Sequence, residues 1–312
     1  MDLFKEILNG NKVALSKGIT LLESSLDSDY KIAQDLLQKC LAHSGNSIRI
    51  GITGVPGVGK SSFIEVFGKL LTSKGYKVAI LTIDPSSEKN HGSILGDKSR
   101  MHTLSVDENA FIRPSPTAGT LGGLSSKTKD NIIICEAAGF DIIIIETVGV
   151  GQSETKVSKI CDFFLLLMLS GAGDELQGIK RGIMEQADML VITKAEGDNL
   201  QKAKNAKQEY QRALHLFPAM DNGWAPKVSV CSSLERTGIS EIWGIISSFN
   251  KQMTSSKWKE EHRKRQNIYW LHHNIKEELG NKKYQSLSVE TVKELEEKLL
   301  KGKTIFEIMK DI

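Results

Sequence analysis

The sequence predicts an α/β fold, with an open, doubly wound and mostly parallel sheet that carries helices on both faces. Two observations lead to this fold class. Strand-like and helix-like segments alternate between residues 47 and about 250. Several strand-like segments are continuous runs of Ile, Val and Leu, as expected for parallel strands buried on both faces. In such sheets, ligands bind at the carboxyl ends of the strands.

The elements follow one another in three groups. Residues 1–45 carry apolar residues at helical spacing, and Gly45-Asn46 interrupts the pattern. The predicted strands then lie at 47–53, 77–84, 140–146, 163–169, 189–194 and 227–231. Beyond residue 250, the segments 254–279 and 288–312 are expected to be helical.

The last group carries an apolar stripe that has two interpretations. The stripe consists of Ile268, Trp270, Leu271, Ile275 and Leu279. Such a stripe either packs on its own domain or forms a contact in a dimer. We therefore expect an N-terminal helical segment (1–45), an α/β domain (46–250) and a C-terminal helical arm (251–312).

The composition excludes several classes of protein. The chain has 312 residues, of which 40% are hydrophobic and 25% charged, as in ordinary soluble globular proteins. A net charge of +3 is too small to indicate a nucleic-acid surface, and the longest apolar run, Phe163 to Leu169, is too short to span a bilayer. The first residues show no targeting signal, and the four cysteines form no Cys-x-x-Cys pair. We expect free thiols and a cytoplasmic location, with no nucleic-acid or membrane partner.

A phosphate-binding loop is the strongest functional signal. Residues 54–61 read Gly-Val-Pro-Gly-Val-Gly-Lys-Ser and lie between a predicted strand and a predicted helix. This order aims backbone N–H groups and the positive end of a helix dipole at one point, as in P-loop nucleoside triphosphatases. Lys60 is expected to reach the β and γ phosphates and to act in catalysis, and Ser61 to bind Mg²⁺. The expected phosphate-binding residues are Gly54, Val55, Pro56, Gly57, Val58, Gly59, Lys60, Ser61 and Ser62.

Acidic residues at other strand ends indicate the rest of a Mg²⁺ site. Glu146 ends a buried strand, where a Walker-B carboxylate belongs, and Gly149 leaves room for its amide near the γ-phosphate. Asp84 ends the second strand, and Asp97 lies in a glycine-bearing loop. The expected metal-region residues are Ser61, Asp84, Asp97 and Glu146.

A third motif indicates selectivity for guanine. Residues 193–196 read Thr-Lys-Ala-Glu at a strand end where guanine-selective enzymes commonly carry Asn-Lys-x-Asp. Glu196 keeps the two acceptor oxygens that N1–H and the 2-amino group of guanine require, although it is one methylene longer than Asp. The expected base-binding residues are Thr193, Lys194, Glu196, Ser232, Ser233 and Leu234.

The residue that orients the attacking water in many GTPases is replaced. The position after Gly149 is Val150, which cannot bind water. We therefore expect slow intrinsic hydrolysis that accelerates when another group completes the site. Candidates for this group are Gln152, Arg100 and Lys180. The expected catalytic residues are Lys60, Glu146, Gln152 and Lys180.

Long stretches of the chain resemble the methylmalonyl-CoA mutase-associated GTPases of the MeaB/ArgK type. The matching strings are the P-loop segment from Gly51, Ile-Asp-Pro-Ser-Ser from Ile83, Gly-Ser-Ile-Leu-Gly-Asp-Lys-x-Arg-Met from Gly92, Glu-Thr-Val-Gly-Val-Gly-Gln-Ser-Glu from Glu146, and residues 173–188. The resemblance implies a GTPase that acts as a chaperone of an adenosylcobalamin-dependent acyl-CoA mutase. It also implies a homodimer built through the C-terminal arm, acidic Mg²⁺-region positions at Asp84, Asp97 and Glu146, and a mutase-responsive segment around Lys180.

Three other functions stay open at this point. A metallochaperone GTPase needs clustered metal ligands, whereas His91 and His102 are isolated and His272-His273 face apart on a helix. A P-loop kinase linked to amino-acid transport needs an acceptor pocket and a base, and the sequence indicates neither. A nucleotide-gated scaffold that barely hydrolyses GTP is compatible with Val150.

Overall fold

In the computed structural model, the described residues are 2–24, 26–84, 101–116, 126–147, 156–171 and 181–309. They form two compact units. The helical unit comprises Met1–Asn46, Ser126–Gly139 and Lys259–Ile312, and the sheet unit comprises Ser47–Ser125 and Phe140–Trp258. The helical unit thus draws on all three segments expected from the sequence, whose division at residues 45/46 and 250/251 stays a prediction.

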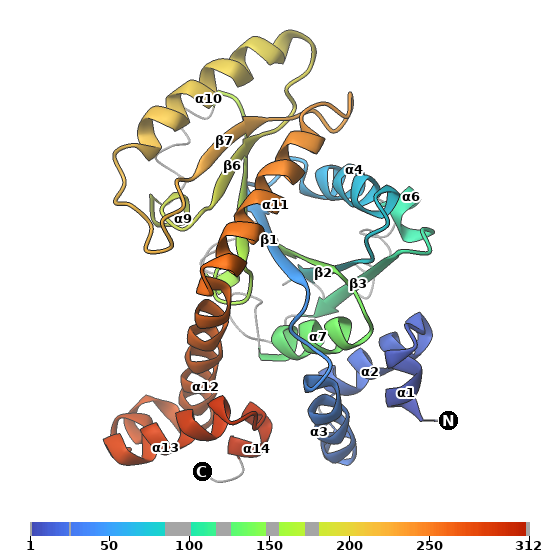
Figure 1. The fold of residues 1–312 in the computed structure, drawn as a ribbon, viewed down its shortest axis with the longest axis vertical. Helices are drawn as coiled ribbons and strands as arrows, with labels where there is room; N and C mark the ends of the chain where they lie inside the picture. Colours follow the sequence, from blue (N-terminus) through green and yellow to red (C-terminus); the bar gives the residue numbers. More distant parts are fainter. Residues whose placement is uncertain are drawn as a thin grey trace. The chain divides into compact units, whose positions relative to one another are not determined.

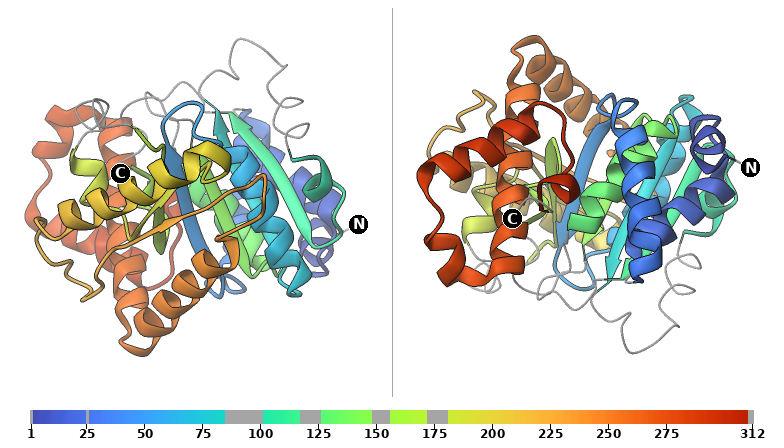
Figure 2. Two further views of the ribbon diagram at one scale, coloured as in Figure 1. Left: turned by 90° about the horizontal axis from the view of Figure 1, so that it is seen from above. Right: turned by 90° about the horizontal axis from the view of Figure 1, so that it is seen from below.

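The sheet unit is built on a seven-stranded sheet in the order β3-β2-β4-β1-β5-β6-β7. Every strand pair is parallel (Figures 1 and 2). The strands are β1 (Ile48–Gly54), β2 (Val78–Asp84), β3 (Ala110–Pro116), β4 (Ile142–Thr147), β5 (Phe163–Met168), β6 (Met189–Ile192) and β7 (Lys227–Val230). From β1 the chain winds first toward β3 and later toward β7, so the predicted doubly wound fold is confirmed.

The sequence does not predict β3, and its composition explains why. The strand reads Ala-Phe-Ile-Arg-Pro-Ser-Pro, and Pro114 and Pro116 interrupt any strand pattern. Within the described part of the chain, β3 pairs only with β2 and forms an edge of the sheet. Proline is tolerated at a sheet edge because it lacks an N–H group, and on the open side of an edge strand no neighbouring strand needs that donor.

Helices cover both faces of this sheet. The sheet unit contains α4 (Lys60–Ser73), α6 (His102–Ser105), α9 (Arg181–Met184), the 3₁₀ turn η2 (Gly197–Asn199), α10 (Leu200–Leu214) and α11 (Ile239–Ser255). Phe67 of α4 and Trp243 of α11 share one core, with ring centroids 6.3 Å apart. The crossovers β1–α4–β2 and β6–α10–β7 run in opposite directions along the sheet, so right-handed connections place α4 and α10 on opposite faces (Figure 2).

The helical unit joins three distant segments of the chain. It contains α1 (Leu3–Leu8), α2 (Lys12–Glu23), α3 (Asp27–Leu41), α7 (Ser126–Ala137), α12 (Trp258–Gln285, with a non-helical residue at Gly280), α13 (Val289–Leu300) and α14 (Ile305–Met309). The Arg263 guanidinium lies 3.7 Å from the buried Glu136 carboxylate and donates to the Gly45 carbonyl at 2.6 Å. Glu136 in turn accepts from the Gly45 N–H at 2.8 Å.

Part of the apolar stripe of α12 packs within the helical unit. Leu271 and Ile275 form a buried cluster with Leu295 of α13 and Ile308 of α14. Trp270 is fully buried as well. Leu271 and Ile275 therefore contribute to the core of their own unit.

Two general expectations can be compared with the structure. All four cysteines are free and buried, which confirms the expectation of free thiols. No helix among the described residues has the length and apolar character needed to cross a membrane.

Three aspartates organise the amino-terminal edge of the sheet. Asp141, Asp162 and Asp188 directly precede β4, β5 and β6. Their carboxylates accept from backbone N–H groups at the starts of neighbouring strands: Asp141 from Lys77 at 2.8 Å, Asp162 from Arg49 at 2.9 Å and Asp188 from Phe164 at 2.8 Å. These bonds favour the observed register, because each would be lost if its strand shifted.

Burial changes the ionisation of Asp188. Desolvation raises the pKa of this carboxyl to about 7, against the opposing effect of the bond from Phe164. Between pH 3.8, its ordinary value, and pH 7, the folded chain therefore holds a proton that the unfolded chain has lost. This contribution to the free energy of unfolding is fully present below pH 3.8 and is lost as the pH rises through 7.

Replacing Asp188 by Asn should remove this pH dependence. The amide oxygen still accepts from Phe164, but it does not titrate. Between pH 4 and pH 8 we expect the wild type to lose on the order of 4 kcal/mol of unfolding free energy relative to Asp188→Asn. Urea unfolding at a series of pH values measures the difference. Asp141→Asn, which alters a similar strand-capping carboxylate at an exposed position, is the matched control; parallel wild-type and Asp188→Asn profiles would contradict the assignment.

Candidate functional site

The P-loop lies between the carboxyl end of β1 and the first turn of α4. A Cβ atom at Gly54 would lie 2.5 Å from the Leu167 carbonyl oxygen of β5, so a larger residue would separate the two strands. Gly59, the N-cap of α4, has a left-handed backbone with φ of 93°. Both positions therefore require glycine for the loop to wrap over the helix terminus.

Two side chains hold the loop in place. The Lys60 ammonium donates to the Gly54 carbonyl at 2.8 Å. The buried Thr193 hydroxyl lies 2.7 Å from the Val58 carbonyl and 3.2 Å from the Met168 carbonyl. Thr193 follows β6, so its hydroxyl ties the loop to that strand end.

Ser61, at the end of the P-loop, and Glu146, in β4, form a side-chain contact. The Ser61 hydroxyl donates to Glu146 Oε1 at 3.1 Å. Glu146 is buried in β4, in register with Ile52 of β1 and Thr82 of β2. A hydroxyl and a carboxylate at a P-loop are the oxygen donors that Mg²⁺ prefers. Asp84 ends β2, two residues beyond Thr82.

This donor set does not resemble a transferable metal site. Among the residues that the structure describes, no group of three or more His, Cys, Asp or Glu side chains is placed to hold a metal ion. Mg²⁺ in nucleotide sites is bound by one or two protein oxygens together with phosphates and waters. The pair Ser61 and Glu146 fits that pattern.

A cavity of about 380 Å³ brings the predicted base-binding residues together. Its lining combines the start of α4 with the ends of β6 and β7: Val58, Gly59, Ser62, Glu65, Val66, Thr193, Lys194, Glu196, Ser233 and Leu234. Lys194 has a positive φ of 56°, and Asn199 Nδ2 donates to its carbonyl at 2.6 Å. Ser232 is different, because its buried hydroxyl accepts from the Glu235 N–H at 2.9 Å and shapes the following turn.

Glu196 gives this cavity a specific polarity. Its Oε2 atom is buried and has no hydrogen-bond partner among the described residues. A buried carboxylate oxygen without a donor is costly, and a base that presents N–H groups would supply the missing bonds. Burial and then the Glu196 charge raise the pKa of Cys231 to about 12, so the adjacent thiol stays neutral. The cavity therefore suits a guanine edge.

The sequence did not identify Glu65 as part of this cavity. Glu65 lies one turn after Ser61 on α4, and this spacing could have placed it at the cavity wall. Its carboxylate also accepts from the N–H groups of Thr103 at 2.9 Å and Leu104 at 3.3 Å. Glu65 thus joins the cavity to the start of α6.

Several predicted residues lie outside the described part of the chain. These are Asp97, Arg100, Gly149, Val150, Gln152 and Lys180. Their roles stay predictions, as do those of Pro56 and Gly57, which lie in the described loop. The structure brings together two groups of predicted residues: Lys60, Ser61 and Glu146 at the P-loop, and Thr193, Lys194, Glu196, Ser233 and Leu234 around the cavity.

The site geometry agrees with the comparison to known families. Residues 15–288 match the family model described as methylmalonyl Co-A mutase-associated GTPase MeaB. The chain belongs to the MeaB family. It is a GTPase that hydrolyses GTP at a P-loop, as its relatives' names and its fold indicate.

Individual members of the MeaB family are similar over most of the chain. GTPase ArgK of Escherichia coli (strain K12) is 44% identical over 280 residues, which cover 90% of this chain and 85% of ArgK. The mouse protein named methylmalonic aciduria type A homolog, mitochondrial, is 44% identical over 311 residues, covering 96% and 75% of the two chains. A crystal structure titled LAO/AO transport system kinase superposes with a TM-score of 0.78 at 36% identity, covering 96% and 90%.

The bond from Thr193 to the P-loop can be tested with isosteric variants. Thr193→Val keeps the shape of the side chain but leaves the buried Val58 carbonyl without its donor. We expect GDP to bind about tenfold more weakly, which corresponds to about 1.4 kcal/mol. Thr193→Ser, which keeps the hydroxyl, should stay near the wild type. Isothermal titration calorimetry measures the GDP affinity of each variant. Equal affinities for the wild type and the two variants would contradict a role of the Thr193–Val58 hydrogen bond in GDP binding.

The role of Glu196 predicts a change of base preference. In Glu196→Gln, an amide donor replaces one acceptor oxygen, so the variant should lose GDP affinity by at least about tenfold and gain affinity for XDP, whose 2-oxo group accepts. Glu196→Asp keeps both acceptors and should keep the preference for GDP. Competition titrations with GDP and XDP decide the matter; an unchanged preference in Glu196→Gln would remove Glu196 from the base site.

Proposed function

We propose that this GTPase is a chaperone of an adenosylcobalamin-dependent acyl-CoA mutase of the methylmalonyl-CoA mutase type. Its nucleotide state would be coupled to cofactor loading and to protection of the mutase. The observation that carries this proposal is the match of residues 15–288 to a family described as mutase-associated. The mouse relative, named for methylmalonic aciduria, supports the same connection.

The site residues suggest how the GTP would be held. The loop N–H groups and the positive end of α4 bind the phosphates, while Lys60 is oriented by the Gly54 carbonyl. Glu196, Lys194, Ser233 and Leu234 would enclose the base. Ser61 and Glu146 would hold Mg²⁺, with Asp84 and Asp97 as further acidic groups nearby; when bound, Mg²⁺ neutralises charge on the phosphates.

Hydrolysis would be completed by the partner or by a segment that responds to it. Val150 offers no hydrogen bond to the attacking water, and Gln152, Arg100 and Lys180 are the proposed groups that replace this contact. Completing such a site changes the rate by about 10³–10⁵ in related GTPases. The mutase would thereby control when GTP is consumed.

The assembly is also part of the proposal. By analogy with the family, the chain would form a homodimer through residues 251–312 in the cytoplasm, without nucleic-acid or membrane partners. Leu271 and Ile275 are already packed inside the helical unit, so other side chains of the arm would make that contact.

Lys60→Ala tests the coupling between nucleotide and partner. Removing the ammonium should reduce GTP turnover by at least about 100-fold, because a positive charge aimed at the transferred phosphate is lost. Pull-downs with a cobalamin-dependent acyl-CoA mutase, with GDP, a non-hydrolysable GTP analogue or no nucleotide, should show nucleotide-dependent binding for the wild type only.

Lys74→Ala, an exposed lysine at the other end of α4, is the matched control and should behave as the wild type. Wild-type binding that ignores the nucleotide, or no binding in any state, would count against the chaperone proposal. Product analysis in the same samples separates hydrolysis from transfer: phosphate on an acceptor would favour a kinase instead.

A further inference from the structure

Strand β7 forms an edge of the sheet. Among the residues that the structure describes, it pairs with β6 alone and ends the strand order. The N–H groups of Lys227 and Cys231 donate toward β6, to the carbonyls of Asp188 and Ile192. Backbone groups alternate in direction along a strand, so Val228 and Val230 direct theirs away from β6.

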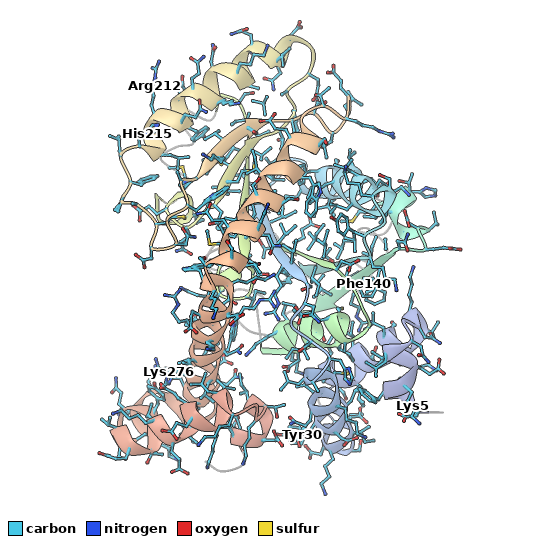
Figure 3. The ribbon with its side chains drawn as sticks, viewed as in Figure 1. Lys5, Tyr30, Phe140, Arg212, His215 and Lys276 are labelled. Atoms are coloured by element: carbon cyan, nitrogen blue, oxygen red, sulfur yellow. The ribbon has the colours of Figure 1, made fainter. Side chains whose placement is uncertain are left out.

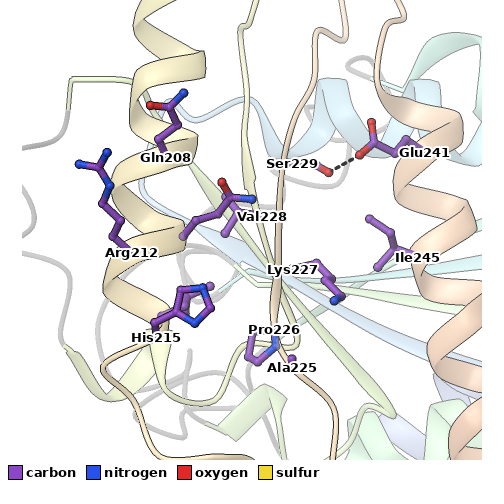
Figure 4. A pocket seen from close by; sticks show the side chains of 12 residues that line it. Gln208, Arg212, His215, Ala225, Pro226, Lys227, Val228, Ser229, Glu241 and Ile245 are labelled. Carbon is purple, nitrogen blue, oxygen red and sulfur yellow. Dashed lines mark hydrogen bonds between the residues drawn. The ribbon is translucent and has the colours of Figure 1, made fainter.

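A cavity of about 610 Å³ runs along this open edge. Helix α10 lines it on one face of the sheet and helix α11 on the other (Figure 4). The residues that line it are Gln208, Gln211, Arg212, Leu214, His215, Ala225, Pro226, Lys227, Val228, Ser229, Glu241 and Ile245. We call this cavity the β7 groove. Its apolar part comes from Leu214, Val228 and Ile245.

The charged side chains of the β7 groove are mainly basic. Arg212 and His215 project from the end of α10, and Lys227 stands at the start of the edge strand (Figures 3 and 4). Neither Arg212 nor Lys227 forms an ion pair with another described residue. Glu241, the one carboxylate among the described residues that line the groove, accepts from the Ser229 hydroxyl at 2.9 Å and is thus already engaged.

The sequence of β7 also disfavours the addition of an apolar strand from another chain to this edge. Strand β7 is only four residues long, follows Pro226 and begins with a lysine. Short length, proline and lysine are the features by which proteins keep apolar strands from adding to a sheet edge. A strand that carries carboxylates would satisfy Lys227 and Arg212, so the same features select an acidic strand.

We propose that the β7 groove binds an extended, acidic segment of a partner protein by strand addition. The segment would pair with the N–H and carbonyl of Val228 and with the N–H of Val230, because Gly238 already lies against the Val230 carbonyl. Side chains on one face of the segment would lie against Arg212 and Leu214 of α10, and those on the other face against Lys227 of β7 and Ile245 of α11. The segment would therefore need a carboxylate and an apolar group on each face. Main-chain bonds supply affinity in this mode of recognition, and the flanking side chains supply specificity.

A peptide titration tests the proposal on the full-length protein. The probe is a fluorescein-labelled peptide of about ten residues in which Glu-Glu pairs alternate with Val-Val pairs, so that each face of the extended chain carries both carboxylates and apolar groups. A second peptide has Lys in place of Glu, and a third carries N-methyl groups on alternate amides. Fluorescence anisotropy should show saturable binding of the first peptide, with the other two at least about tenfold weaker. Hydrogen exchange at the Val228 and Val230 amides should slow on binding.

Matched charge reversals locate the contact. Arg212→Glu with Lys227→Glu should weaken binding of the acidic peptide at least about tenfold. Lys202→Glu with Lys204→Glu makes the same charge change on α10 outside the groove and should have little effect. GTP turnover should be unchanged in both double variants, which shows that they are folded.

Three results would overturn the proposal. They are equal loss in the two double variants, equal binding of the N-methylated peptide, and equal binding of a single-stranded oligonucleotide of similar charge. The first and third would indicate unselective attraction of polyanions to α10. Failure of the wild type to bind the acidic peptide would also reject it, whether or not the mutase proposal holds.

Discussion

The close approach of β1 and β5 is the constraint on which the nucleotide site depends. Gly54 meets the Leu167 carbonyl so closely that only hydrogen fits between them. This contact fixes where the P-loop leaves the sheet, and the loop then directs Lys60 back to the Gly54 carbonyl and Ser61 toward Glu146. The tie from Thr193 secures the other side of the loop. The side chains of Lys60, Ser61 and Thr193 are thus positioned by contacts with the ends of buried strands.

The carboxyl ends and the amino ends of the strands carry polar side chains with different roles. At the carboxyl edge, Glu146 accepts from Ser61 and Thr193 donates to the P-loop, while Glu196 Oε2 has no hydrogen-bond partner among the described residues. At the amino edge, the side-chain carboxyl groups of Asp162 and Asp188 accept hydrogen bonds from backbone N–H groups of neighbouring strands. Register is therefore fixed at the edge away from the chemistry, which leaves the opposite edge free for function.

Sequence patterns predicted the sheet and the P-loop because both depend on local rules. Apolar runs and glycine spacing sufficed for β1, β4 and the loop between β1 and α4, whereas the prolines of β3 concealed an edge strand. Thr193 was expected at the base, and the structure places its hydroxyl on the Val58 carbonyl, a long-range contact that spacing does not encode. Glu65 was missed for the same reason, since its partners Thr103 and Leu104 lie far along the chain.

The discontinuity of the helical unit has a consequence for biosynthesis. Its contributions come from Met1–Asn46, Ser126–Gly139 and Lys259–Ile312. Arg263, from the last of these, contacts both Gly45 and Glu136. At about 5–20 residues per second, the ribosome exposes the first helices many seconds before their last neighbours exist. The early helices therefore stay incompletely covered until Lys259–Ile312 has been synthesised, and the nascent chain exposes their apolar surface to aggregation during this interval.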